Sequence, residues 1–347
     1  MILIATGFII TKIILAVAVF LLSLGVAAYA TYGERKVAAF LQDRIGPNRA
    51  GPFGLLQPIA DGVKMFMKEE IIPNVSNKAL FILGPSLFMM TALMTGAVIP
   101  WAPDPGIEID GQPLHIQVTD INIGILYLLG VVSIGVYGIM IGGWASNNKY
   151  SLLGALRASS QMISYEIAMG LSVIALVMVT GTLSLREIAE QQTSWHWNIL
   201  LQPVGFLIFF ICALAETNRA PFDLPECETE LVGGYHTEYS SMKLGMFLFA
   251  EYINMFISSA IMSTFYFGGY NMPFIGRWVH DPVWLSVLGF VFLFAKIVTF
   301  IFIFMWIRWT FPRFRYDQLM NLGWKMLLPL SLANIMVTAL IKLIFMD

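Results

Sequence analysis

The stretch PVWLSVLGFVFLFAKIVTFIFIFMW, residues 282–306, contains one charged residue, Lys296, and decides the class of fold. A helix needs a run this long and apolar to cross the roughly 30 Å hydrocarbon core of a bilayer. The whole chain has the same character, because 58% of its 347 residues are hydrophobic and 12% are charged. Soluble domains carry about 25% charged residues. The composition therefore excludes a soluble enzyme, a secreted disulfide-rich protein and a disordered chain.

Apolar runs of similar length recur on both sides of this stretch. The eight predicted spans are residues 8–31, 79–101, 120–144, 158–180, 198–215, 242–267, 282–306 and 324–345. None of them shows the ten-residue alternation of a membrane β-barrel strand. The sequence predicts an all-α polytopic membrane protein, a single membrane domain over residues 1–347 with eight transmembrane helices.

The distribution of Lys and Arg predicts the orientation of the spans. Most of the 20 basic residues lie in or beside four connecting segments, 32–78, 145–157, 217–241 and 307–323. The positive-inside rule places these segments on the cytoplasmic side, so that both termini face outward. The first span then runs opposite to a signal peptide and is expected to be retained. We expect a multi-pass protein of a bacterial inner membrane, and an organellar inner membrane is the less favoured alternative.

The first inner loop predicts an amphipathic helix at the membrane surface over residues 55–70. Its apolar side chains recur at helical spacing on one face: Leu56, Ile59, Val63, Phe66 and Met67. Asp61 and Lys64 fall on the other face. The same pattern also fits a helix that packs on the bundle and only closes it.

Acidic residues gather in the third inner loop. This loop contains one arginine, Arg219, and the acids Asp223, Glu226, Glu228, Glu230 and Glu238, while Glu216 ends the preceding span. A run of acids is typical of a solvated face. Here, however, prolines and apolar residues interrupt the acids, and the loop joins two spans that carry carboxylates themselves.

Three ionisable residues fall inside predicted spans: Glu166, Glu251 and Lys296. Each is placed about 12–15 Å from the inner end of its helix at ~1.5 Å rise per residue. A charge at the bilayer centre costs ~2.5–3.5 kcal/mol, so such residues normally face the bundle interior or a water-filled cavity. Their similar depth predicts a shared polar pocket or proton path. Structural ion pairs or neutral acids that lock helices together are the alternative.

The sequence predicts no redox centre in this chain. Two cysteines are too few for an iron–sulfur cluster, and all four histidines fall in predicted loops, where no transmembrane pair holds a haem. Neither dinucleotide-binding nor P-loop motifs are present, and the formal charge of −2 gives no reason to expect nucleic acid. We therefore expect no metal site, and any electrons or energy must come from a partner or a gradient.

Five long segments resemble the H-subunit family of proton-translocating NADH–quinone oxidoreductases, the membrane subunits of respiratory complex I. They occur in the family's order: GERKVAAFLQDRIGPNRAGPFGLLQPIADGVK (33–64), GWASNNKYSLLGALRASSQMISYE (143–166), AETNRAPFDLPE (215–226), ELVGGYHTEYSSMKLGMFLFAEY (230–252) and FPRFRYDQLMNLGWK (311–325). The resemblance covers nearly the whole chain, and the family's eight-helix layout agrees with the predicted spans.

The resemblance implies that the inner loops line a chamber for quinone, which is bound as substrate at the junction with the peripheral arm. The residues expected to line or shape the chamber are Glu34, Arg35, Arg44, Arg49, Asp61 and Lys64. Those expected to couple quinone chemistry to proton movement are Glu166, Glu216, Glu226, Glu228, Glu230 and Glu251, and we add Lys296 from its position in a span.

The resemblance also implies partners. FMN, NADH and the iron–sulfur clusters belong to other subunits, among them the peripheral-arm subunit that holds the terminal cluster and the other peripheral subunits of the quinone site. Small membrane subunits and antiporter-like subunits are expected alongside, in contact with membrane lipid.

One departure from the family concerns the third span. Some members carry a glutamate near Ser133–Gly135, where this chain has no acid, so its proton path must manage without that group or use water. Other interpretations stay open: the equivalent subunit of a ferredoxin- or hydrogenase-linked complex, and a purely structural anchor for the peripheral arm. A stand-alone secondary transporter is disfavoured, because no internal repeat is visible.

Overall fold

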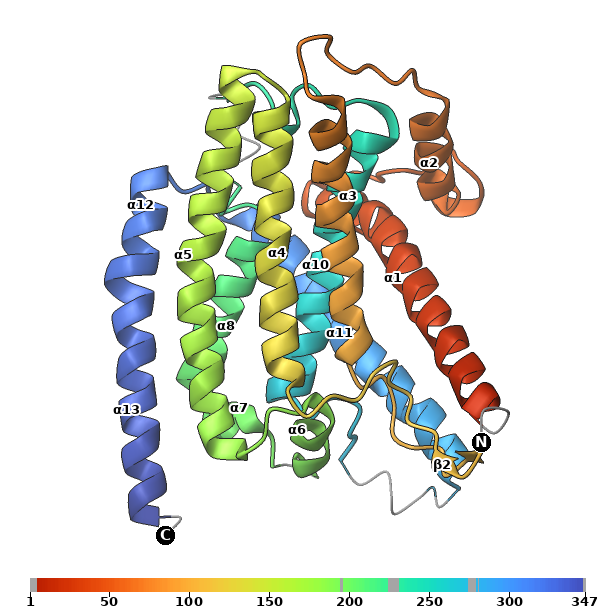
Figure 1. Cartoon of the computed structure of the whole chain (residues 1–347), viewed down its shortest axis with the longest axis vertical. Coiled ribbons are helices and arrows are strands. Elements are labelled where there is room, and N and C mark those ends of the chain that lie inside the picture. The colour runs from red at the N-terminus through yellow and green to blue at the C-terminus, as the bar shows by residue number, and fades with distance from the viewer. Residues whose placement is uncertain (1–4, 194–195, 224–230, 274–278, 280, 346–347) are drawn as a thin grey trace.

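The protein, described here from a computed structural model over residues 5–193, 196–223, 231–273, 279 and 281–345, is a bundle of long helices (Figure 1). The long helices are α1 (Ala5–Leu41), α3 (Lys78–Thr95), α4 (Gly124–Ala145), α5 (Lys149–Thr180), α10 (Ser241–Tyr266), α11 (Pro282–Thr310) and α13 (Leu328–Phe345). The shorter helices are α2 (Gln57–Met67), α6 (Leu185–Gln191), α7 (Asn198–Leu201), α8 (Pro203–Glu216) and α12 (Tyr316–Asn321). Single turns lie at Pro52–Gly54, Gly96–Val98 and Gly234–His236, and Leu322–Leu327 forms a π-helical turn.

The all-α polytopic class is confirmed. Among the described residues, seven helices are long and apolar enough to cross a membrane. The predicted span over residues 198–215 forms α7 and α8, which are separated at Gln202. Its main part, α8, has 14 residues and is therefore about 21 Å long at 1.5 Å per residue. This segment is shorter than a full crossing of the hydrocarbon core.

Several helices extend into segments that the sequence suggested were loops. Helix α1 continues to Leu41, ten residues beyond the predicted end of the first span, because its charged residues Glu34 and Arg35 find ion-pair partners there. Helix α5 begins at Lys149, inside the expected loop 145–157, where the Asn148 side chain accepts a hydrogen bond from the backbone of the first turn. The surface helix forms as α2, slightly shorter than predicted.

Helix α10 lies at the centre and packs against α1, α3, α8 and α11. The closest helix pair is α3 and α4, whose backbones meet at Gly84, Gly138 and Gly142. A β-carbon added at Gly84 would lie 2.7 Å from the Gly142 Cα. Glycines are required here because any side chain would push the two helices apart.

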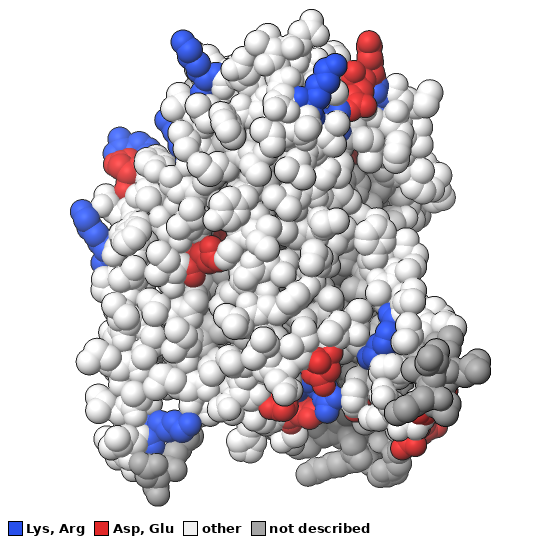
Figure 2. Space-filling view, viewed as in Figure 1, with Lys and Arg blue, Asp and Glu red and all other residues white. Residues whose placement is uncertain are grey.

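The charged residues fit a membrane-spanning bundle. They gather at the two ends of the molecule and leave a broad, nearly uncharged band between them (Figure 2). Helix α1 begins and α13 ends at the same end, opposite the surface helix α2 (Figure 1). At that end a two-stranded hairpin, β1 (Glu108–Ile109) and β2 (Gln112–Pro113), covers part of the bundle.

Candidate functional site

A buried ion-pair network lies near the α2 end of the bundle and is centred on Glu34 of α1. Its Oε2 accepts hydrogen bonds from Arg219 Nη1 at 2.6 Å and from the Tyr252 hydroxyl at 2.8 Å. Its Oε1 is paired with Arg308, from the last turn of α11. One carboxylate therefore ties together α1, α10, α11 and the loop after α8.

Arg219 is held in place by the loop that carries it. The Gln161 amide on α5 donates to the carbonyls of Ala215 and Phe222, each at 2.8 Å, and so fixes both ends of the turn. The guanidinium carbon lies 3.9 Å from the centre of the Tyr252 ring. A cation over an aromatic face is attracted by the ring's quadrupole, which helps to offset the loss of water.

The network continues from Arg219 to Glu251 of α10. Arg219 Nε lies 3.9 Å from Glu251 Oε2, and the Tyr235 hydroxyl donates to Glu251 Oε1 at 2.9 Å. Burial alone disfavours the charged guanidinium, but Tyr252 and the two carboxylates outweigh it and raise the pKa of Arg219. Two carboxylates thus face two arginines, which is the balance that a buried charge cluster requires.

The network borders a cavity of about 180 Å³ between α1, α2, α10 and α11. Arg219, Glu251, Tyr252 and Arg308 line one side of it, and Arg35, Asp61 and Lys64 line the other. Asp61 of α2 pairs with Arg35 Nη1 at 2.8 Å and lies 3.8 Å from Lys64 Nζ. The cavity therefore offers both cationic donors and carboxylate acceptors to a polar headgroup.

Helix α2 covers this cavity and is fastened to the bundle at both ends. The Arg35–Asp61 pair holds its first half to α1. Near its other end, the Ser241 hydroxyl donates to the Met65 carbonyl at 3.0 Å, and Lys243 of α10 pairs with Glu70. The polar face of α2 thus meets the cavity, while Ile59, Val63 and Phe66 remain exposed.

A second acidic site lies between α4, α5 and α8. Glu166 and Glu216 line the same small void of about 10 Å³, together with Val132, Val136, Met162, Met169 and Cys212. Glu166 also pairs with the Ser133 hydroxyl of α4. In Figure 2 a single acidic patch breaks the uncharged band of the visible face, over α4 and α5, the helices that carry Ser133 and Glu166.

Lys296 lies apart from both acidic sites. Its Nζ donates to the carbonyls of Phe267, Gly269 and Asn271 at 2.6, 2.7 and 3.2 Å, beyond the C-terminal end of α10. The rings of Trp197 and Phe292 flank the ammonium group. Lys296 therefore neutralises the carbonyl end of a helix. Glu166, Glu251 and Lys296 thus lie at three separate places instead of in the predicted shared pocket.

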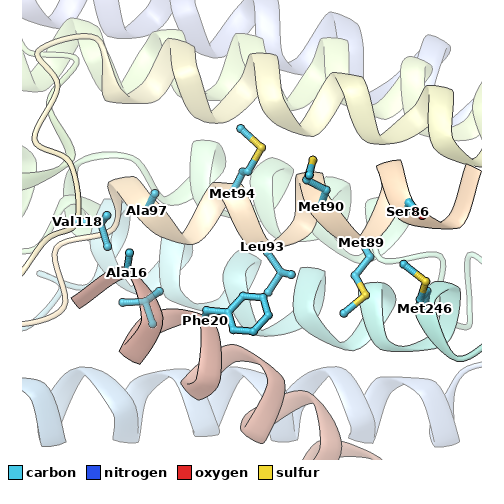
Figure 3. Close-up of a pocket in the computed structure, with 11 residues that line it drawn as sticks. Ala16, Phe20, Ser86, Met89, Met90, Leu93, Met94, Ala97, Val118 and Met246 are labelled. Atoms are coloured by element: carbon cyan, nitrogen blue, oxygen red, sulfur yellow. The ribbon is translucent and has the colours of Figure 1, made fainter. Parts of the chain in front are cut away.

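Another cavity, larger than the polar one, is apolar, and no titratable group lines it. It has a volume of about 480 Å³ and lies between α1, α3 and α10, where Phe20, Leu93 and four methionines form most of its wall (Figure 3). Ala16 and Phe20 of α1 line the apolar cavity, and Ala28 and Thr31 line the polar one. The two cavities therefore both border α1.

The other predicted residues fall into two groups. Arg44 and Arg49 lie exposed in the segment between α1 and α2 and do not line the cavity. Glu226, Glu228 and Glu230 lie outside the described residues.

Sequence reasoning did not single out several residues that the structure places at these sites: Ser133, Tyr235, Tyr252 and Arg308. A feature of the sequence points to Arg219, since it is the only arginine in an acidic loop. A weaker feature points to Arg308, which is a cation just beyond the end of an apolar span. No feature of the sequence distinguishes the two tyrosines, because a buried tyrosine resembles any other core aromatic residue.

Together, the fold and the network define an integral membrane protein of helical type that keeps balanced charges inside its bundle. Within the described ranges, no group of three His, Cys, Asp or Glu residues is arranged to hold a metal ion.

Comparison with known proteins gives the family. The sequence profile of the NADH dehydrogenase family matches residues 12–339. The chain is 69% identical to the NADH-quinone oxidoreductase H subunit 1 of Cytophaga hutchinsonii, over 97% of this chain and 98% of that protein. It is 62% identical to the NADH-quinone oxidoreductase H subunit of Flavobacterium psychrophilum, over 98% of this chain and 99% of that protein. It is 48% identical to NADH-quinone oxidoreductase subunit 8 of Rhodothermus marinus, over 90% of this chain and 92% of that protein. The chain belongs to the NADH dehydrogenase family and is similar to H subunits along nearly its whole length.

Proposed function

We propose that this chain is the membrane subunit of a proton-translocating NADH–quinone oxidoreductase that builds the quinone chamber and couples quinone reduction to proton translocation. The observation that carries the proposal is the buried network of Glu34, Arg219, Tyr252 and Arg308, which borders a cavity beside Glu251. A protein keeps several charges inside a membrane bundle at a substantial cost, and usually does so for function.

Quinone is the ligand that the two cavities suit best. The polar cavity presents Arg219 and Arg308, which can donate to the oxygens of a headgroup, beside the α2 cover with Asp61 and Lys64. The apolar cavity, which also borders α1, suits a hydrocarbon tail. Arg44, Arg49 and the acids of the third inner loop then face the peripheral arm, whose subunits hold FMN and the iron–sulfur clusters.

Coupling follows from electrostatics at low dielectric. A quinone that takes up electrons gains negative charge and attracts protons. The reduced quinone then competes with the carboxylates of Glu34 and Glu251 for the positive charge of Arg219. Charges that interact this closely titrate as a group, so the gain or loss of a proton at one carboxylate alters the protonation of the next. In this scheme the change in protonation passes through the acids of the third inner loop and Glu216 to Glu166. Antiporter-like subunits then respond to the protonation state of Glu166. In this scheme Lys296 supports the outer end of α10 instead of carrying protons.

The orientation follows from the positive-inside rule. The α2 end faces the cytoplasm of a bacterial inner membrane, and both termini lie outside. The names of the curated relatives favour NADH as the electron donor over ferredoxin or hydrogen. The donor is bound elsewhere in the complex, so identifying the subunits that co-purify with a tagged chain, and testing which donor supports inhibitor-sensitive quinone reduction, decides this point.

The test is Glu216→Gln and Glu166→Gln in the assembled enzyme, with proton pumping and NADH-dependent quinone reduction measured in inverted membrane vesicles. Because an amide cannot exchange a proton, we expect each variant to lose most proton pumping while assembly is kept. Glu108→Gln, at the exposed hairpin of the opposite end, is the control. Full pumping and full reductase activity in both variants would contradict the proposal, and a defect confined to assembly would favour a structural anchor.

A further inference from the structure

Ser133 of α4 is the polar partner of the intramembrane carboxylate Glu166. Its Oγ lies within hydrogen-bond reach of two acceptors, the Glu166 carboxyl and the Leu129 carbonyl one helical turn earlier, the latter at 2.9 Å. The neighbouring residues Val132 and Val136 line the void that Glu166 shares with Glu216. The serine therefore stands where α4 meets the proposed proton path.

The hydroxyl group has one proton and two possible recipients for it. When Glu166 is ionised, the Ser133 O–H donates to the carboxylate. When Glu166 is protonated, its own O–H donates to Ser133 Oγ, and the serine proton turns to the Leu129 carbonyl. No proton leaves the serine in either state, and a rotation about one bond exchanges the two arrangements. Both forms of the carboxyl group are thus hydrogen-bonded to a partner within the chain.

We propose that Ser133 is a positioning residue for proton coupling, whose hydroxyl serves both protonation states of Glu166. This inference rests on the proposed function. It also accounts for the absence of an acid at Ser133–Gly135, because a hydroxyl that accepts and donates in turn can support proton exchange at Glu166 without a second carboxyl. An acid within the membrane that lacked such a partner would favour its neutral form and exchange protons poorly.

The test replaces the hydroxyl and then restores it. In Ser133→Ala, we expect the number of protons pumped per NADH oxidised to fall roughly two- to tenfold, the factor that corresponds to the loss of one typical intramolecular hydrogen bond. Ser133→Thr keeps an Oγ at this position and should recover most of the pumping. The control is Ser160→Ala on α5, a serine whose hydroxyl donates to the carbonyl one turn earlier, at 2.7 Å, as Ser133 does.

An infrared difference spectrum of the reduced against the oxidised enzyme gives the second readout. The carboxyl band that disappears in Glu166→Gln should shift in Ser133→Ala and return to its place in Ser133→Thr. Loss of pumping in Glu166→Gln with normal pumping and an unshifted band in Ser133→Ala would overturn this inference and leave the proposed function standing. Equal defects in the Ala and Thr variants would also overturn it, since they would point to packing. Normal pumping in Glu166→Gln would instead contradict the proposed function itself.

Discussion

Glu34 is the residue on which the inner site depends most. It is 6% exposed and accepts from Arg219, Arg308 and Tyr252, which come from three different parts of the chain. Removing one member of a buried charge cluster is costly because the remaining charges lose their compensation. An exposed ion pair behaves differently, since water replaces the missing partner.

Glu34→Gln should therefore destabilise the protein by ~3–5 kcal/mol, because the buried Arg219 and the partly buried Arg308 lose the carboxylate that pairs with both of them. The measurements are the thermal inactivation midpoint of the solubilised complex and the amount of assembled enzyme in membranes. Glu190→Gln is the matched control: Glu190 pairs with Arg186 at 3.0 Å on the exposed outer side, and its loss should cost ~0–1 kcal/mol. Equal midpoints for the two variants would show that the Glu34 network does not hold the inner end together.

The ion pairs also show what a single sequence can reveal at this scale. Glu34 and Arg219 are separated by 185 positions, and Glu34 and Arg308 by 274. Nothing local in the sequence relates such residues, so reasoning from the sequence found Glu34, Arg35, Asp61 and Lys64 through family resemblance and missed Arg308 and Tyr252. The intramembrane charges were detectable, because a charge inside an apolar run is a local signal.

At the scale of the element, the spans were predictable because an apolar run of about 20 residues is itself a property of contiguous sequence. Counting residues along a helix was a poorer guide to depth. Lys296 lies halfway along α11, yet it meets the carbonyl end of α10, because α11, like α1, runs obliquely to α4, α5 and α13 (Figure 1). Equal counts give equal depth only for helices with equal tilt.

The contact between α3 and α4 gives a prediction for helix packing. A β-carbon at Gly138 would lie 2.8 Å from the Phe88 backbone nitrogen and 2.9 Å from the Gly84 carbonyl oxygen. Gly138→Ala should therefore destabilise the bundle by ~1–3 kcal/mol, as overpacking does elsewhere. Gly130→Ala on the same helix meets nothing within 4 Å and should be neutral or slightly stabilising, because alanine is the better helix former.

Both glycine variants are compared by their thermal inactivation midpoints in the same detergent. Because α4 carries Ser133, separation of α3 and α4 in Gly138→Ala should also lower proton pumping. A Gly138→Ala protein as stable as Gly130→Ala would mean that the two helices tolerate a wider spacing, and that their glycines are not required for packing.

At the scale of the whole molecule, the isolated chain is incomplete as a membrane protein. Glu166 is only partly buried and lies on α5, with Ile163 and Ile167 exposed on either side of it. Facing lipid, an ionised group near the centre of a bilayer costs ~2.5–3.5 kcal/mol. The helices of this chain leave it partly uncovered. We therefore expect a neighbouring subunit of the complex to provide a polar surface there, as the proposed proton path out of this chain also requires.

This reasoning predicts that the α4–α5 face is a subunit interface. The sequence has two cysteines, of which Cys212 is buried, and Cys227 is replaced by serine for this experiment. In that protein, Ile163→Cys should react with a membrane-permeant maleimide when the chain is expressed alone and should be protected in membranes that contain the whole complex. Glu108→Cys, on the exposed hairpin at the other end, should react in both cases. If Ile163→Cys reacts equally in the two membranes, lipid covers this face, and a proton leaving Glu166 would have no neighbouring subunit to receive it.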